Sequence, residues 1–149
     1  MKLEDEIVQK SFDSDYHKVA VNIFYTSNWL ENIHTEAFKP HNLTIQQFNI
    51  LRILRGQYPK TVNLKLIKDR MLDKMPDVSR LVERLREKGL VDRKTCSSDR
   101  RHIDVCITQD GLNLLKEIDA DIKRINSRFS ALNEDEVETL NKLLDKLRG

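Results

Sequence analysis

The sequence has little of several residue types, and each shortage excludes a class of protein. Only four glycines occur among the 149 residues, and they do not form a glycine-rich loop that could cradle phosphate groups. Two cysteines are too few for a disulfide framework. No apolar run approaches the roughly 18 residues that cross a bilayer, and the acidic segment 1–6 lacks the apolar core of a secretion signal. These absences predict a cytoplasmic protein with no membrane partner.

The chain also lacks the residue sets that enzymes and metal sites use. The pattern contains no nucleophile with a general base and no paired carboxylate site. The histidines at positions 17, 34, 41 and 102 show no ligand-like spacing with the cysteines. We therefore expect neither an enzyme, nor a metal site, nor a bound cofactor.

The two cysteines flank the tip of a predicted hairpin. In a simple hairpin Cys96 faces about His102 and Cys106 faces about Asp92, so the two sulfurs are separated by several residues along the ladder. A disulfide within one subunit is not expected, and two unpaired thiols are the simpler interpretation. The alternative is that Cys96, close to the tip, senses oxidants.

Charge is abundant and unevenly distributed. Charged residues make up 34% of the chain, although the net charge is only +2. Residues 80–101 hold eight Lys or Arg against four Asp or Glu, a local charge of +4, which leaves −2 for the rest of the chain. Because a charge cluster alone is commonly a solvated surface, it indicates a nucleic-acid partner only together with a binding motif.

Apolar residues recur every three or four positions along most of the chain, which predicts a mainly helical fold. The first long helix covers residues 16–37 and stops at Pro40. Thr44 and Gln47 have the capping-box spacing ahead of a short helix, which Gly56 is expected to close in a left-handed conformation. Further helices are predicted to begin at Thr61 or Asn63, Pro76, Thr108 and Asn133.

Residues 61–110 follow the order of a winged helix-turn-helix. The helix that opens with Pro76 ends at Gly89, and alternating residues then predict two strands at 90–95 and 102–107. One face of this helix is apolar and holds it to a core, as a helix in the major groove of DNA requires. Its candidate DNA contacts are Asp77, Ser79, Arg80 and Arg84.

The predicted tip between the two strands carries Asp99, Arg100 and Arg101. An arginine on a narrow hairpin can enter the minor groove, where A·T-rich steps concentrate negative potential. Asp99 can hold the guanidinium of Arg101 in a fixed pose. The helix and the tip together predict binding to double-stranded DNA.

Four runs of sequence carry a resemblance to a known family: 43–51 (LTIQQFNIL), 79–93 (SRLVERLREKGLVDR), 99–101 (DRR) and 107–111 (ITQDG). Together they resemble the MarR family of transcription regulators. The resemblance is close over residues 43–115 and extends to the flanking helices in general layout. Arg101 falls on the wing arginine of that family, and Asp99 falls on its partner acid.

The resemblance implies a mainly α fold with a small β-hairpin wing, in one domain that covers residues 1–149. The segments 15–40 and 110–149 would form the dimerisation helices, and 43–109 would form the winged module that binds DNA. The apolar stripes favour a homodimer independently of the family, because a module of about 70 residues cannot cover all of them.

By the same resemblance, the expected function is that of a dimeric repressor on a pseudo-palindromic operator, released by a small aromatic or phenolic molecule or by an oxidant. The first long helix contains no cysteine, so the hydroperoxide sensing of some family members is not expected. Tyr25, Trp29 and His34 could line an effector cavity at the dimer junction, although aromatic residues at this spacing are more commonly core or interface.

A second class of function is an interaction module that keeps the winged fold without binding specific DNA. The arginines of the predicted tip and the local charge of +4 argue against it.

Overall fold

The computed structural model describes residues 2–95 and 103–149, apart from the side chains of residues 94, 95 and 103. It is mainly helical with a small antiparallel sheet, as the sequence predicts. The described elements are α1 (Leu3–Glu6), α2 (Asp15–Phe38), a 3₁₀ turn (Lys39–His41), α3 (Ile45–Arg55), β1 (Val62–Asn63), α4 (Leu64–Arg70), α5 (Val78–Glu87), β2 (Val91–Thr95), β3 (Ile103–Ile107), α6 (Gln109–Asn126), a second 3₁₀ turn (Ser127–Ala131) and α7 (Glu134–Arg148).

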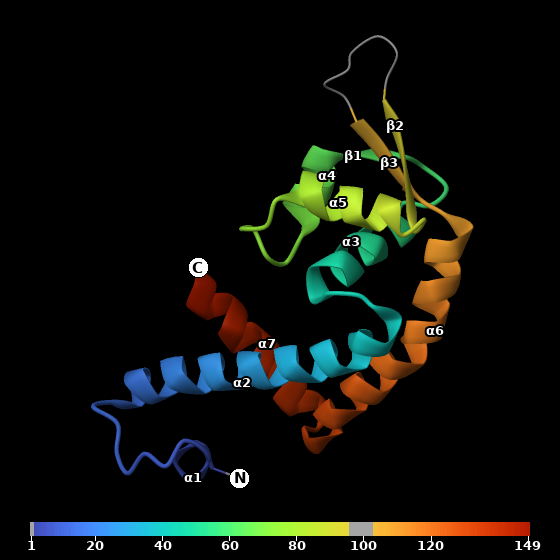
Figure 1. Ribbon diagram of the computed structural model, residues 1–149. Helices are drawn as coiled ribbons and strands as arrows, with labels where there is room; N and C mark the ends of the chain where they lie inside the picture. The colour runs from blue at the N-terminus through green and yellow to red at the C-terminus, as the bar shows by residue number, and fades with distance from the viewer. Residues whose placement is uncertain (1, 96–102) are drawn as a thin grey trace.

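The helices form two regions that share α6. In Figure 1, α2 lies across the lower part of the molecule, and α3, α4, α5 and the strands form a module above its C-terminal end. α6 runs down from the base of the hairpin, packs against α2 and leads into α7. The module with the strands is therefore connected to the long helices through the end of α2 and through α6.

Local capping explains where most helices begin. Thr44 Oγ1 accepts from the Gln47 N–H at 3.2 Å, and Gln47 Oε1 accepts from the Thr44 N–H at 3.2 Å, which confirms the predicted capping box. Asn63 caps α4 and Thr108 caps α6, each with a side-chain oxygen that accepts a backbone N–H three residues ahead. Asn133 forms the second capping box.

Two local predictions are wrong. Gly56 does not close α3 in a left-handed conformation, because its φ of −67° and ψ of −13° lie in the right-handed helical region. Pro76 does not lie in the first turn of α5, because the helix begins at Val78 and Asp77 is its N-cap. The Asp77 carboxylate accepts the Arg80 N–H, as the side chain of an N-cap residue does, and Pro76 therefore lies outside the helix.

The sheet has three strands in the order β1–β3–β2, so β2 is an edge strand. The hairpin pairs Val91 with Ile107 and Arg93 with Val105, and the predicted pairing of Asp92 with Cys106 is confirmed. Cys96 lies outside the described residues. The two-residue strand β1, which pairs with β3, was not predicted because so short a segment shows no alternation.

One core lies between the sheet, α3, α5 and α6, and α2 reaches it mainly with its C-terminal end. Phe38 is the buried residue of α2, and its ring is tilted against Phe48 with centroids 4.4 Å apart. The fully buried side chains of the core include Ile50, Leu51, Leu54, Ile67, Leu85, Val91, Val105, Leu115 and Ile118.

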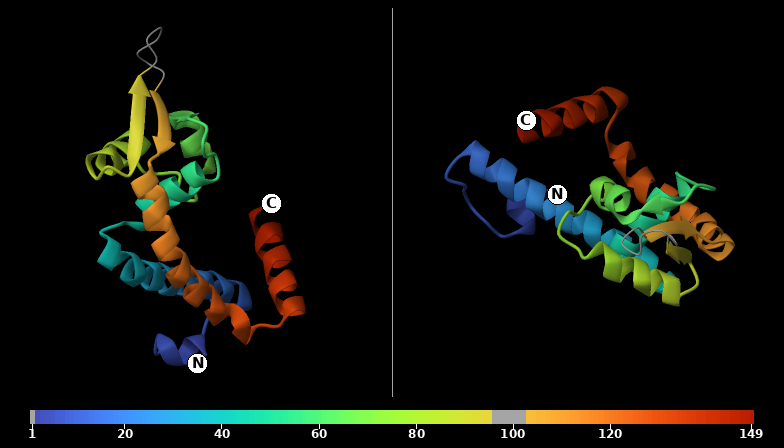
Figure 2. Two further views of the ribbon diagram at one scale, coloured as in Figure 1. Left: turned by 90° about the vertical axis from the view of Figure 1, so that its right-hand side faces the viewer. Right: turned by 90° about the horizontal axis from the view of Figure 1, so that it is seen from above.

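Outside this core, two helices keep apolar side chains in solvent. α7 has no buried residue, and Leu140 and Leu147 are 43% and 64% exposed. On α2, Tyr16 and Phe24 are 89% and 72% exposed. The left-hand view of Figure 2 shows α7 standing apart from the winged module. None of the described helices combines the length and apolar character that crossing a membrane requires.

The close approach of α6 to the turn before β2 requires glycine at position 111. A Cβ there would lie 2.4 Å from the Leu90 carbonyl oxygen and 2.7 Å from Cγ1 of Ile107. We expect Gly111→Ala to lower the free energy of unfolding by about 1–3 kcal/mol, because a backbone carbonyl cannot move aside cheaply. Urea unfolding followed by circular dichroism measures this change.

Gly56→Ala is the matched control. Its added Cβ would meet nothing closer than the Ile53 carbonyl oxygen at 3.5 Å, and its φ of −67° suits alanine. Its stability should stay unchanged or rise by up to about 1 kcal/mol. Equal unfolding curves for the two variants would show that the contact at Gly111 relaxes without cost.

Candidate nucleic-acid interface

The helix α5 is fixed on one side and open on the other. Val82 and Leu85 are 1% and 0% exposed, whereas Ser79, Arg80 and Arg84 are exposed. Arg80 and Arg84 are four residues apart and therefore share a face of the helix. In the described part of the chain, neither guanidinium forms a hydrogen bond or an ion pair with a carboxylate. The structure thus brings three of the predicted contact residues together on the open side of α5.

Asp77 has a defined structural role at the start of the same helix. Its Oδ1 accepts the Arg80 N–H at 3.2 Å, so this carboxylate satisfies one of the free backbone donors of α5. Asp77 is exposed, and its contact with DNA stays a prediction.

The predicted tip residues Asp99, Arg100 and Arg101 lie outside the described residues. The structure describes the strands on which the tip stands. Their lower ends are anchored beside α5, because Thr108 Oγ1 donates to the Gly89 carbonyl at 2.7 Å and the Thr108 N–H donates to the Leu90 carbonyl at 3.1 Å. Gly89, at φ +71°, makes the turn from helix to strand in the left-handed region.

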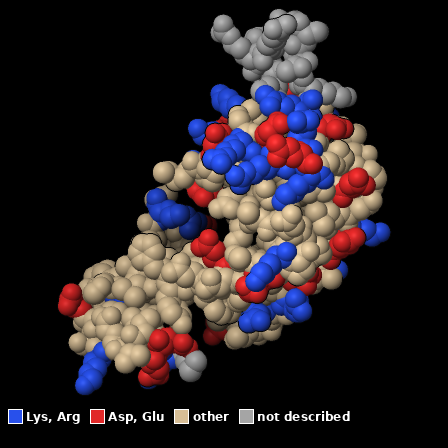
Figure 3. Space-filling view, in the orientation of Figure 1, with Lys and Arg blue, Asp and Glu red and all other residues tan. Residues whose placement is uncertain are grey.

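Basic side chains gather over the winged module. In Figure 3, Lys and Arg gather over the upper part of the molecule with Asp and Glu among them, whereas the surface over α2 at the lower left is mostly uncharged. The residues include three on α4 that the sequence analysis did not single out. The exposed basic side chains of this region include Lys65, Lys68, Arg70, Lys74, Arg80, Arg84, Arg86, Lys88 and Arg93.

One acidic side chain of α5 holds two arginines from different elements. The Glu83 carboxylate accepts from Arg86 at 2.7 and 3.0 Å within the helix, and from Arg93 of β2 at 3.2 Å. The hydrogen bond from Arg86, and then that from Arg93, hold the pKa of Glu83 below its ordinary value of 4.5. Because a lowered carboxyl pKa stabilises the fold above that pKa and the contribution is lost as pH falls through it, these contacts are intact at neutral pH.

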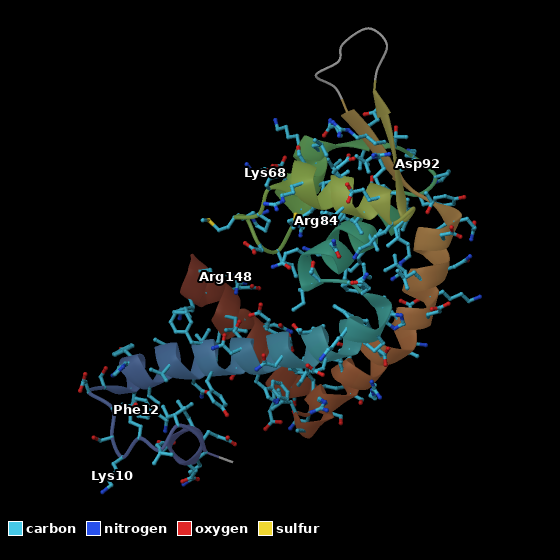
Figure 4. The ribbon with its side chains drawn as sticks, in the orientation of Figure 1. Lys10, Phe12, Lys68, Arg84, Asp92 and Arg148 are labelled. Carbon is cyan, nitrogen blue, oxygen red and sulfur yellow. The ribbon has the colours of Figure 1, made fainter. Side chains whose placement is uncertain are left out.

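The end of α5 is tied to the start of α3 by Lys88. Its ammonium group donates to the Asn42 carbonyl and, at 3.1 Å, to Oε1 of Gln47, which is 3% exposed. The same Gln47 oxygen accepts the Thr44 N–H, so Lys88 also contacts the capping box of α3. Arg84 and Lys88 line a hollow of about 460 Å³ between these elements, with Lys39 at its edge. Figure 4 labels Arg84 on α5.

The three candidate effector residues do not lie in one place. Tyr25 and Trp29 line a hollow of about 490 Å³ with Leu3 and Glu6 of α1. The Tyr25 hydroxyl donates to Glu6 at 2.8 Å, and this hydrogen bond raises the pKa of Tyr25 above its ordinary value of 10.0. His34 does not line this hollow. Its Nδ1 is 2.8 Å from the Leu30 carbonyl oxygen, and its ring packs edge-on against Phe38 with centroids 5.7 Å apart.

Comparison with known proteins identifies the module. A model of the MarR family matches residues 43–103, which span α3 to the start of β3. The HTH-type transcriptional regulator MgrA of Staphylococcus aureus is 31% identical over 112 residues, covering 75% of this chain and 74% of that protein. The chain belongs to the MarR family.

Solved structures agree with this assignment. A MarR transcription factor from Planctomyces limnophilus is 32% identical to this chain and superposes with a TM-score of 0.71. The match covers 91% of this chain and 98% of that protein. Bordetella bronchiseptica BpsR, whose DNA binding is regulated by 6-hydroxynicotinic acid, is 25% identical, covers 89% of this chain and 99% of that one, and has a TM-score of 0.75.

Membership of the MarR family settles the class of function. The chain is a DNA-binding transcription regulator with a winged helix-turn-helix, and it is not an enzyme. The helix α5 and the hairpin of β2 and β3 are the elements that the sequence analysis identified as the recognition helix and the wing.

Proposed function

We propose that this MarR-family chain is a homodimeric repressor that binds a pseudo-palindromic operator through α5 and the hairpin tip, and that a small aromatic acid or phenol releases it. The observation that carries the proposal is the open face of α5, where Arg80 and Arg84 have no carboxylate partner among the described residues. A guanidinium in this position can reach guanine edges or phosphates with two parallel hydrogen bonds. The dimer would present two such helices about 34 Å apart, one turn of DNA.

The exposed apolar helices support the dimer. The stripe of α7 contains Val137, Leu140, Leu143 and Leu147, which are 38–64% exposed. A helix with an apolar stripe and no buried residue has little packing to stabilise it in a lone protomer. Covering this stripe and the exposed side of α2 with a second copy removes apolar surface from water, and homodimer formation is typical of the family.

Arg84→Ala tests the DNA interface. We expect it to weaken binding to a duplex selected from a random-sequence pool by about 5- to 100-fold, because a bidentate contact is lost. Fluorescence anisotropy at several salt concentrations measures the affinity. A decrease of about 0.9 in the magnitude of the negative slope of log K against log salt would assign Arg84 to a phosphate, and an unchanged slope would assign it to a base edge.

Lys10→Ala is the control for charge, since Lys10 is exposed on the N-terminal segment, far from α5 in Figure 4. It should leave the affinity within about twofold of wild type. Arg101→Ala should weaken binding mainly at A·T-rich flanks of the site. If wild type binds selected and scrambled duplexes equally, the chain is an interaction module without specific DNA binding, and the proposed function is wrong.

Leu140→Glu tests the dimer. A carboxylate in the apolar stripe of α7 would have to be buried without a partner against the second copy. We expect the variant to sediment as a monomer at micromolar concentration, where wild type is a dimer. Lys142→Gln changes the charge of α7 by the same one unit at an exposed position on the side of the helix opposite Leu140, and it should stay dimeric. If both variants sediment as dimers, α7 is not part of the dimer interface.

The hollow between α1 and α2 supports the effector part of the proposal, because it combines an aromatic wall with the Tyr25 hydroxyl. Trp29 is the single tryptophan, so its fluorescence should change when 4-hydroxybenzoate binds there. Tyr25→Phe should weaken this binding by about 2- to 10-fold because it removes a hydrogen bond. His34→Ala, outside the hollow, should not. If the Trp29 fluorescence shows no saturable change at concentrations of 4-hydroxybenzoate that release the selected duplex, the effector binds elsewhere.

A further inference from the structure

The contact between Glu83 and Arg93 joins the two elements of the proposed interface. Glu83 lies on α5, one helical turn before Glu87, and Arg93 is the middle residue of β2. Their side chains are 35% and 33% exposed and meet at 3.2 Å. Arg86, 50% exposed, donates to the other carboxylate oxygen. The carboxylate is therefore held from both sides, within its own helix and from the strand.

The register of the hairpin explains why Arg93 points to α5. Successive side chains of a strand alternate between its two faces, so Arg93 shares the face of Val91. Val91 is fully buried in the core beside α5, and Arg93 is paired with Val105, which is also fully buried. At this level the core still covers Val105 of the central strand, whereas Arg93 lies on the edge strand β2. A long side chain there reaches α5, and Glu83 is the acid that it meets.

Apart from this contact, the hydrogen bonds that attach β2 to the end of α5 among the described residues lie at the base of the strand. The turn at Gly89 and the two hydrogen bonds from Thr108 fix the start of the strand. β2 pairs with β3 on one side and has an unpaired edge on the other. β3 is held on its other side by β1, with Val62 paired to Val105 and Asn63 to Asp104. The Glu83–Arg93 ion pair holds the opposite, unpaired edge of the hairpin directly to α5, nearer the tip than the Thr108 contacts.

We propose that Glu83 is a positioning residue for DNA binding, which sets the direction of the hairpin relative to α5 by holding Arg93. This inference rests on the proposed function, in which α5 and the hairpin bind one duplex together. The negative charge of Glu83 repels the phosphate groups of DNA and by itself lowers the affinity for any duplex. Its effect on specific binding and its effect on sequence-blind binding therefore have opposite signs.

Glu83→Gln separates the two effects. The substitution keeps the size of the side chain and removes its charge. We expect the affinity for the selected duplex to fall by about tenfold, which is a typical size for the interaction between two side chains in contact. Binding to a scrambled duplex of the same composition should be unchanged or tighter. Arg93→Gln reaches the same contact from the strand, and the double variant should lose no more specific affinity than Arg93→Gln alone.

Glu87→Gln is the matched control. Glu87 is exposed one turn farther along α5, and the same negative charge is removed there without an ion pair to break among the described residues. It should bind both duplexes as tightly as wild type or more tightly. Thermal unfolding of the three single variants should agree within a few degrees, so that a loss of affinity is not a loss of folded protein.

Glu83→Gln that binds both duplexes like Glu87→Gln would overturn the inference, because the charge would then act only by repulsion. Losses that add fully in the double variant would overturn it as well, since Glu83 and Arg93 would then act separately. If wild type itself shows no preference for the selected duplex, the proposed function fails and the inference fails with it. The wild-type measurement alone shows that result, so it is distinguished from a failure of the inference about Glu83.

Discussion

The burial of one side of α5 is the constraint on which the rest of the interface depends. Val82 and Leu85 leave solvent almost completely, and they pack in the same core as Ile50 and Leu54 of α3. Burying such side chains contributes about 1.5–3 kcal/mol each. Because the period of a helix fixes the opposite face once one face is buried, this packing alone determines that Arg80 and Arg84 are exposed side by side.

Polar contacts then attach α5 to the elements around it, in addition to its packing in the apolar core. Lys88 ties the end of α5 to Gln47 at the start of α3, and Glu83 ties its middle to β2. At the end of α3, Arg55 donates to both oxygens of Asp119 on α6, at 2.9 and 3.0 Å. The recognition helix is thus joined by charge-assisted hydrogen bonds to neighbouring elements, and α6 carries the connection to the long helices.

Local features of the sequence predicted much of the fold. Capping at Thr44, Asn63, Thr108 and Asn133 involves residues only three positions apart, so the spacing itself indicates where each helix starts. Pro76 predicted the first turn of α5, whereas the helix begins at Val78 with Asp77 as its N-cap. β1 escaped prediction because two residues carry no period, and its pairing with β3 depends on a strand some forty positions away.

The sequence by itself determined the mainly helical class, the winged module and the side of α5 that carries the arginines, since periodicity and capping act over a single helical turn. Only the tertiary structure decided that Glu83 meets Arg93, that Tyr25 and Trp29 share a hollow without His34, and that α7 lies uncovered. These outcomes depend on how separate elements turn toward one another. That orientation follows from packing among distant residues, which spacing along one chain does not encode.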